Sequence, residues 1–101
     1  MIRAVVVVPA HNEEELIGDC VRALEAQRGL ARDEYEIVVV LDRCTDGTAE
    51  QALAAGEVRL IHARGAGVGH ARRTGMDLAA TLLEPFGLIA TTDADSTVDR
   101  D

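Results

Sequence analysis

Short apolar runs rich in β-branched residues alternate along the chain with longer segments in which apolar residues recur every three or four positions. The apolar runs cover residues 4–8, 36–41, 58–61 and 86–92. Runs of this length are typical of parallel strands that are buried on both faces. The helical spacing between them predicts three helices, which should end near Gly29, Gly56 and Pro85.

The sequence also predicts where some of these elements begin and end. Pro9 is expected to end the first strand, because proline lacks the N–H that a strand needs. Asn12, with Glu15 three residues later, is expected to cap the first helix as a capping box. Leu16 in the first helix and Leu53 in the second belong to the apolar stripes that should face the sheet.

Four strands separated by three helices form successive right-handed βαβ units. The predicted fold class is therefore α/β, a Rossmann-like parallel sheet of about four strands with helices on both faces. The 101 residues fit a single domain, 1–101. No helix follows the fourth strand, so we expect the chain to be the front part of a larger fold with an uncovered sheet face, through which a homo-oligomer can form.

Composition excludes several classes of function. The chain has 18 acidic residues against 10 Arg, two aromatic residues and a net charge of −8, whereas nucleic-acid binding needs a basic surface and stacking rings. The longest apolar run, 4–10, is far shorter than the ~20 residues of a membrane span. Cys20 and Cys44 fit neither a metal knuckle nor a CxxC pair, which favours free thiols in the reducing cytoplasm.

Polar residues follow all four predicted strands at their carboxyl ends, where open parallel sheets bind ligands. They are His11, Asn12 and Glu13, then Asp42 and Arg43, then Arg64, and finally Asp93 and Asp95.

Asp93 and Asp95 are the most specific of these candidates. Residues i and i+2 of an extended segment point the same way, so both carboxylates can face one ion. Carboxylate oxygens suit Mg²⁺ or Mn²⁺, which share their remaining positions with water and substrate phosphates. The alternative is a solvated acidic loop.

The other loop residues have two interpretations each. Asp42 can accept a hydrogen bond from the N–H of a nucleotide base, or it can bond its own loop backbone as an Asx-turn. Glu13 can serve a ligand, or it can complement the dipole of the following helix. His11 can touch a substrate, or it can be a bystander.

The glycine-rich segment 65–69 does not match the dinucleotide-binding pattern. His70 stands where the third glycine would be, and the turn follows the third predicted strand rather than the first. We expect a turn that presents backbone N–H groups and Arg72 to an anion.

Taken together, four segments resemble the family 2 glycosyltransferases, in the same order and at similar spacing. They read VVVVPAHNEEELIGDCVRAL, IVVVLDRCTDGTAEQAL, GVGHARRTGMDLA and LIATTDADSTV. The resemblance implies a GT-A fold whose first half is a nucleotide-binding sheet. It also implies transfer of a sugar from a nucleotide-diphosphate donor of the UDP or GDP type to an acceptor hydroxyl, with inversion.

By this resemblance, individual positions take the family's roles. The loop around the donor nucleotide corresponds to Pro9, Ala10, His11 and Glu13. Asp42 matches the acid that holds the base, and Arg72 matches an arginine near the base and the diphosphate. Asp93 and Asp95 match the family's DxD motif, in which the second Asp binds the divalent cation and the first lies near the ribose or the metal.

The chain also departs from the family pattern. It has Leu41-Asp42-Arg43-Cys44 where the family often has Asp-Asp-Gly-Ser, and Arg73 replaces a common Asn. The family's general base and acceptor-binding half lie beyond the DxD. We therefore expect the catalytic base to lie beyond Asp101, the last residue of this sequence. For residues 1–101 alone we expect donor binding with little or no turnover.

Two alternatives remain open. Asp93-Ala94-Asp95-Ser96-Thr97 also matches the DxDxT of haloacid-dehalogenase-type phosphatases, in which the first Asp is the phosphoryl nucleophile. The second alternative is a non-catalytic domain that self-associates through its uncovered sheet face.

Overall fold

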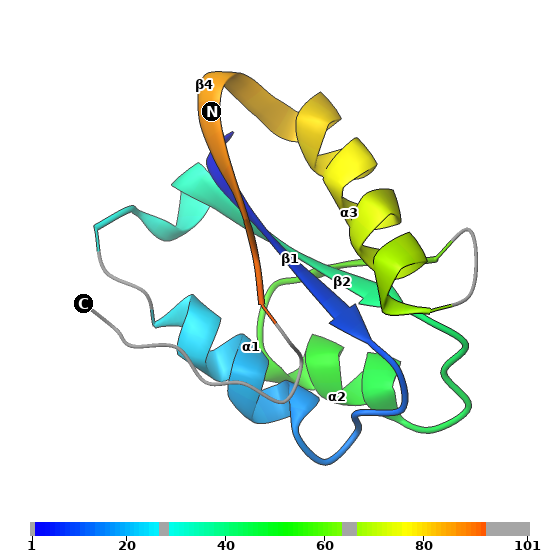
Figure 1. Cartoon of the computed structure of the whole chain (residues 1–101). Coiled ribbons are helices and arrows are strands. Elements are labelled where there is room, and N and C mark those ends of the chain that lie inside the picture. The colour runs from blue at the N-terminus through cyan, green and yellow to red at the C-terminus, as the bar shows by residue number, and fades with distance from the viewer. Residues whose placement is uncertain (1, 27–28, 64–66, 93–101) are drawn as a thin grey trace.

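The computed structural model describes residues 2–26, 29–63 and 67–92, and strands alternate with helices along them (Figure 1). The elements are β1 (Ile2–Ala10), α1 (Ile17–Glu25), a short 3-10 helix η1 (Arg32–Glu34), β2 (Tyr35–Leu41), α2 (Thr48–Ala55), β3 (Arg59–His62), α3 (Val68–Leu82) and β4 (Leu83–Thr91). The predicted α/β class is confirmed.

The strands form one parallel sheet in the order β3-β2-β1-β4. The chain steps from β1 to β2 to β3 in one direction and then returns past β1 to add β4 on its other side. Because such crossovers are right-handed, this reversal places α3 on the opposite face from α1 and α2. Figure 1 shows α3 on one side of the sheet and the other two helices together on the other side.

Alternate residues of the two central strands face the two helical layers. The core under α3 contains Val5, Val7, Val38, Val40, Ala71 and Ala79. The core under α1 and α2 contains Val8, Ile17, Cys20, Val21, Ile37, Val39 and Ala52. The central strands are thus buried on both faces, as their unbroken apolar runs predict.

Pro9 does not end the first strand, because β1 continues to Ala10 and Pro9 pairs with Val40. The carbonyl of Val7 accepts a hydrogen bond from the N–H of Thr92, so the backbone groups of Val7, and of Pro9 two residues on, turn toward β4. The last partner of β1 on that side is Thr91, opposite Val7. A backbone N–H at position 9 would point past the last β1–β4 pair. Proline at this position therefore removes no hydrogen bond of that pairing, and the strand tolerates it.

The predicted capping box at Asn12 is wrong. Helix α1 begins at Ile17, and Asn12 has a φ of +50° with its side-chain oxygen accepting from the N–H of Thr45. Leu16 consequently lies outside the helix and is exposed. Leu53 of α2 is exposed as well, because α2 packs inward through Thr48 and Ala52, four residues apart.

The third helix ends earlier than predicted, at Leu82, and Pro85 lies inside β4. The pairing of β4 with β1 shifts register between Ile2 and Ala4, around this proline. Leu88, opposite Ala4, is exposed on the face that carries α1 and α2. This exposed apolar side chain is compatible with the expected uncovered face.

Within the described ranges, none of the helices has the length and apolar content that crossing a membrane requires. Cys20 is buried and Cys44 is half-buried, and the two are not joined in a disulfide.

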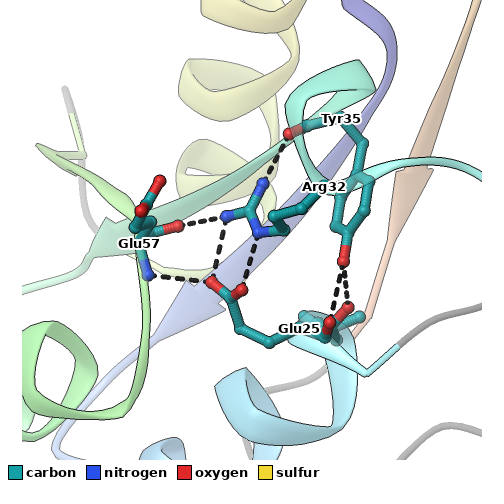
Figure 2. Close-up of polar contacts among 5 residues, drawn as sticks. Glu25, Arg32, Tyr35 and Glu57 are labelled. Atoms are coloured by element: carbon teal, nitrogen blue, oxygen red, sulfur yellow. Dashed lines mark hydrogen bonds and ion pairs between the residues drawn. The ribbon is translucent and has the colours of Figure 1, made fainter.

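A cluster of hydrogen-bonded and charged residues joins neighbouring elements at the amino-terminal edge of the sheet (Figure 2). The guanidinium of Arg32 forms a bidentate pair with Glu25, at 2.7 and 3.0 Å, and also donates to the carbonyls of Tyr35 (2.7 Å) and Glu57. The carboxylate of Glu25 accepts from the N–H of Glu57 at 2.8 Å. The Tyr35 hydroxyl donates to the carbonyl of Leu24 at 2.8 Å. The cluster therefore ties the end of α1 to η1, the start of β2 and the approach to β3.

Gly75 sets the distance between α3 and the sheet. A Cβ at this position would lie 2.3 Å from Cγ1 of Val7 and 2.9 Å from Cγ2 of Val40. We expect Gly75→Ala to lower the free energy of unfolding by about 1–3 kcal/mol, because the helix must move away from β1 and β2. The midpoint and slope of urea denaturation measure this.

Gly69 provides the matched control in the same helix. A Cβ there meets nothing within 4 Å, so Gly69→Ala should leave stability unchanged or raise it by up to about 1 kcal/mol through helix propensity. Equal stability of Gly75→Ala and the unmodified chain would contradict the close contact.

The hydrogen bonds from Arg32 hold the pKa of Glu25 below its ordinary value of 4.5. A lowered native pKa contributes stability above the ordinary pKa, and this is lost as pH falls through the native value. We expect Glu25→Gln to lower the free energy of unfolding at neutral pH by about 1–3 kcal/mol. The difference from the unmodified chain should shrink below about pH 4.5, as urea denaturation at a series of pH values would show.

The control for this change is Glu50→Gln, in the exposed first turn of α2. It should shift stability by less than about 0.5 kcal/mol. A stability gap for Glu25→Gln that stays constant down to pH 3 would show that the carboxylate charge is not what the cluster uses.

Candidate functional site

The candidate site lies at the carboxyl edge of the sheet, where β1 and β2 end side by side. Ala10 and Leu41 are paired at these ends, and the N–H of Asp42 donates to the carbonyl of Ala10 at 2.8 Å. The strand order reverses at β1, with β2 on one side and β4 on the other. Open α/β sheets bind ligands in the crevice that such a reversal creates.

Asp42 is the most firmly held side chain at this edge. Its side chain is only 5% exposed, and its Oδ1 accepts from Nε of Arg43 at 2.9 Å. Its Oδ2 accepts from the N–H of Gly67 at 3.1 Å. The hydrogen bond from Arg43 is the main cause that holds the pKa of Asp42 below its ordinary value, against the opposing effect of burial. Asp42 is therefore a fixed, ionised acceptor, and these contacts are not those of an Asx-turn.

His11 is joined to the same residue. Its Nδ1 lies 2.6 Å from the carbonyl oxygen of Asp42. Because a carbonyl can only accept, Nδ1 carries the proton of this hydrogen bond, and the ring is exposed. This contact brings His11 together with Asp42, and a contact of His11 with a substrate stays a prediction.

The two loops that follow β1 and β2 are locked together by reciprocal hydrogen bonds. The N–H groups of Glu13 and Glu14 donate to the side chains of Thr48 (2.9 Å) and Asp46 (3.3 Å). In return, Oε2 of Glu14 accepts from the N–H of Gly47 at 3.0 Å. Thr48 is fully buried. The loops thus form one unit that holds His11 and Asp42 in place.

The structure gives Glu13, Pro9 and Ala10 structural roles that the sequence does not indicate. Pro9 and Ala10 are buried in β1, and Glu13 contributes its backbone, since its carbonyl accepts from the N–H groups of Leu16 and Ile17 at the start of α1. The Glu13 carboxylate borders an acidic recess of about 220 Å³ between the two loops.

The start of α3 lies against Asp42. Gly67 is the residue before the helix and has a φ of +94°. Its N–H is already bonded to Asp42, so this group of the glycine-rich turn is not available to an anion. Arg72 lies just over one turn further along α3 and is exposed. The structure therefore places Arg72 on the helix that begins beside Asp42.

The predicted metal ligands, Asp93 and Asp95, lie outside the described residues. Thr92, the residue before them, bonds to β1 at the carboxyl edge of the sheet, the same edge that holds Asp42. Among the residues that the structure describes, no three His, Cys, Asp or Glu side chains come together in a way that could hold a metal ion. The role of the DxD motif therefore stays a prediction from the sequence.

The catalytic base also stays unassigned. By the family resemblance it follows the DxD motif, and residues 93–101 lie outside the described part of the chain. Asp42, the buried carboxylate at the carboxyl edge, is engaged by Arg43 and Gly67. An acid whose pKa is lowered in this way is a weak proton acceptor, so Asp42 does not take the place of the expected base.

The sequence motifs include Arg43 and the glycine-rich turn of Gly67 but give neither a contact with Asp42, and they do not mark Thr48. Thr48 begins α2, but its partner Glu13 is 35 positions away, so no local signal marks it. The signal for Arg43 is local, since it directly follows Asp42. It has a φ of +51°, which costs a residue with a side chain roughly 1 kcal/mol. Strain of this kind gathers at functional sites.

A second hollow, of about 510 Å³, lies at the opposite edge of the sheet. It is open, and its lining includes Arg32 and Glu57, which already bond within the cluster of Figure 2. This hollow is larger than the recess beside Glu13. Its Arg32 and Glu57 groups are already engaged in hydrogen bonds, so it is a weaker candidate than the carboxyl edge.

Comparison with known proteins shows a consistent set of relatives. An uncharacterized protein of Methanocaldococcus jannaschii is 41% identical over 91 residues, which are 89% of this chain and 34% of that protein. The chain thus spans about a third of the length of this relative.

Solved structures agree on the fold. TarS of S. aureus in complex with UDP is 24% identical, with a TM-score of 0.80 over 99% of this chain and 29% of that chain. The mannosyltransferase PcManGT from Pyrobaculum calidifontis, in complex with GDP-Man and Mn²⁺, is 27% identical, with a TM-score of 0.75 over 94% and 28%. Glucosyl-3-phosphoglycerate synthase of Mycobacterium tuberculosis, with Mn²⁺, UDP and glucosyl-3-phosphoglycerate, is 25% identical, with a TM-score of 0.67 over 93% and 35%.

These neighbours are GT-A glycosyltransferases, and the four-stranded parallel sheet of this chain has their fold. The family described as Glycosyl transferase family 2 matches residues 5–101. The chain belongs to glycosyl transferase family 2.

Proposed function

We propose that this chain binds a nucleoside-diphosphate sugar, with a divalent cation, as the donor-binding half of a glycosyltransferase. The observation that carries the proposal is the buried, ionised carboxylate of Asp42, fixed beside His11 at the reversal of strand order. A fixed acceptor at this place suits the N–H of a nucleotide base. Relatives of at least 25% identity bind GDP-Man or UDP together with Mn²⁺.

The donor set also fits a hard divalent cation. Asp93 and Asp95 supply only carboxylate oxygens, which suit Mg²⁺ or Mn²⁺ better than softer metals. Bound there, the cation would neutralise charge on the diphosphate as it departs. We assign Asp95 to the cation and Asp93 to the cation or the neighbouring ribose.

The chain's own residues would bind and orient the donor. Asp42 accepts from the base, His11 lies beside it, and Arg72 attracts the diphosphate, whose negative charge grows as its bond to the sugar breaks. An acceptor hydroxyl attacks the anomeric carbon from the opposite side, which inverts its configuration, and gives its proton to a carboxylate base. That base is expected beyond Asp101 and is not assigned to a residue of this chain.

The family match favours this transfer over phosphate-ester hydrolysis. The DxD here follows β4, the last strand of the described sheet, whereas the phosphatase motif follows an early strand. Donor binding is also compatible with self-association through the face that exposes Leu88.

Asp42→Asn tests the base contact. The amide presents N–H groups where the base also donates, so we expect the affinity for UDP or GDP to fall about tenfold or more. Isothermal titration calorimetry measures this. Asp33→Asn, in η1 beside the opposite hollow, is the matched control and should leave affinity unchanged. Equal affinities for Asp42→Asn and the unmodified chain, or no binding of either nucleotide, would count against the proposal.

Asp95→Asn tests the cation. We expect Mn²⁺ to increase the affinity of the unmodified chain for UDP or GDP, because it offsets repulsion between the diphosphate and the carboxylates. Asp95→Asn should remove this increase and leave metal-free binding in place. Asp19→Asn, exposed on α1, should keep the full increase. Titrations that give the same affinity with and without Mn²⁺ would contradict the metal assignment.

A further inference from the structure

Arg43 is the side chain of the site that donor binding, as proposed above, leaves without a role. It follows Asp42 at the end of β2 and adopts a φ of +51°. Its side chain is 59% exposed, whereas that of Asp42 is 5% exposed, and the two are joined by one hydrogen bond of 2.9 Å. Arg43 is therefore the solvent-exposed member of the pair and Asp42 the buried one.

The carboxylate of Asp42 retains capacity for a ligand. Its two oxygens together offer about four lone-pair positions. Among the described residues, Nε of Arg43 uses one position on Oδ1 and the N–H of Gly67 uses one on Oδ2. Oδ1 can thus accept a further hydrogen bond while Arg43 stays in place.

The guanidinium also retains donors. An arginine has five N–H groups in a planar fork. Within the described part of the chain, Arg43 uses only its Nε, and because Oδ2 of Asp42 is turned to Gly67, the pair is not the usual bidentate one. A terminal N–H group neighbours Nε in the same planar fork. The Asp42–Arg43 pair therefore offers an acceptor and a donor next to each other.

This arrangement complements one kind of base edge. Uracil and guanine each carry a ring N–H next to a carbonyl, which matches an acceptor next to a donor. Cytosine and adenine carry an unprotonated ring nitrogen next to an amino group, which places a lone pair against the carboxylate and an N–H against the guanidinium. Resting on the proposed donor binding, we infer that Arg43 is a specificity-determining residue that binds the base carbonyl and selects uracil or guanine nucleotides over cytosine or adenine nucleotides.

The test is calorimetric titration of UDP, GDP and CDP, with Mn²⁺ present, into the unmodified chain and two variants. Arg43→Gly removes the side chain and suits the positive φ, so it should fold. Its affinity for UDP should fall about tenfold while its affinity for CDP changes little, so that the preference for UDP decreases. Arg43→Lys keeps the charge but not the planar fork, and it should lose most of the same preference.

The outcomes separate this inference from the proposal on which it rests. An unmodified chain that binds neither UDP nor GDP overturns both. If Arg43→Gly binds UDP as tightly as the unmodified chain, or more tightly, the inference alone is overturned. Arg43 would then contribute nothing to base binding, or would compete with the base for Asp42. The inference is also overturned if Arg43→Gly loses affinity for UDP and CDP equally and Arg43→Lys regains that affinity. The charge of the side chain would then act on the diphosphate.

Discussion

The parallel pairing of β1 with β2 brings the two loops that carry His11 and Asp42 to one edge of the sheet. It runs without interruption from Ala4 opposite Tyr35 to Ala10 opposite Leu41. Side chains alternate between the two faces of a strand, so a slip of one residue would exchange the cores under the two helical layers. Because each core is a packed cluster of hydrophobic residues, neither can accept the exchange at low cost in packing. The two loops that follow the strands are thereby brought to the same place.

The hydrophobic core positions the loops, but hydrogen bonds between the loops fix their conformations. In the described residues, Asn12 and Arg43 are the two residues other than glycine with positive φ, and each follows a central strand by two positions. Both are bonded across or within the site, Asn12 to Thr45 and Arg43 to Asp42. Local strain of roughly 1 kcal/mol per residue is thus offset by contacts that also orient the acceptor.

The sequence predicts the elements better than their limits. Unbroken apolar runs reveal β1 and β2 because both faces are buried. Pro9 and Pro85 suggest boundaries that the structure does not have, because the effect of a proline in a strand depends on which neighbour its missing N–H would face. Asn12 looks like a helix cap locally, but Thr45, 33 residues later, takes its side chain. Such long-range competition leaves no local pattern in a single sequence.

The sequence predicts the location of the site but not the hydrogen bonds within it. Parallel topology gathers Asp42 and His11 at one edge whatever their partners. The hydrogen bonds to Asp42 from Gly67 and Arg43 depend on the turn before α3 and on a left-handed residue, which composition does not reveal. Asp93 and Asp95 lie outside the described residues, so their role as metal ligands remains a prediction from the motif.

The net charge of the chain is a further constraint on how a donor can bind at the carboxyl edge. A chain with a net charge of −8 repels a nucleoside diphosphate over the distance that screening allows, about 10 Å at 0.1 M salt. A donor site on such a chain must therefore overcome the field locally, with cations held close to the ligand. Arg72 lies on the helix that starts beside Asp42, where its charge acts in this sense. The same acidity attracts divalent cations, so a cation at the DxD would turn the unfavourable field into part of the binding site.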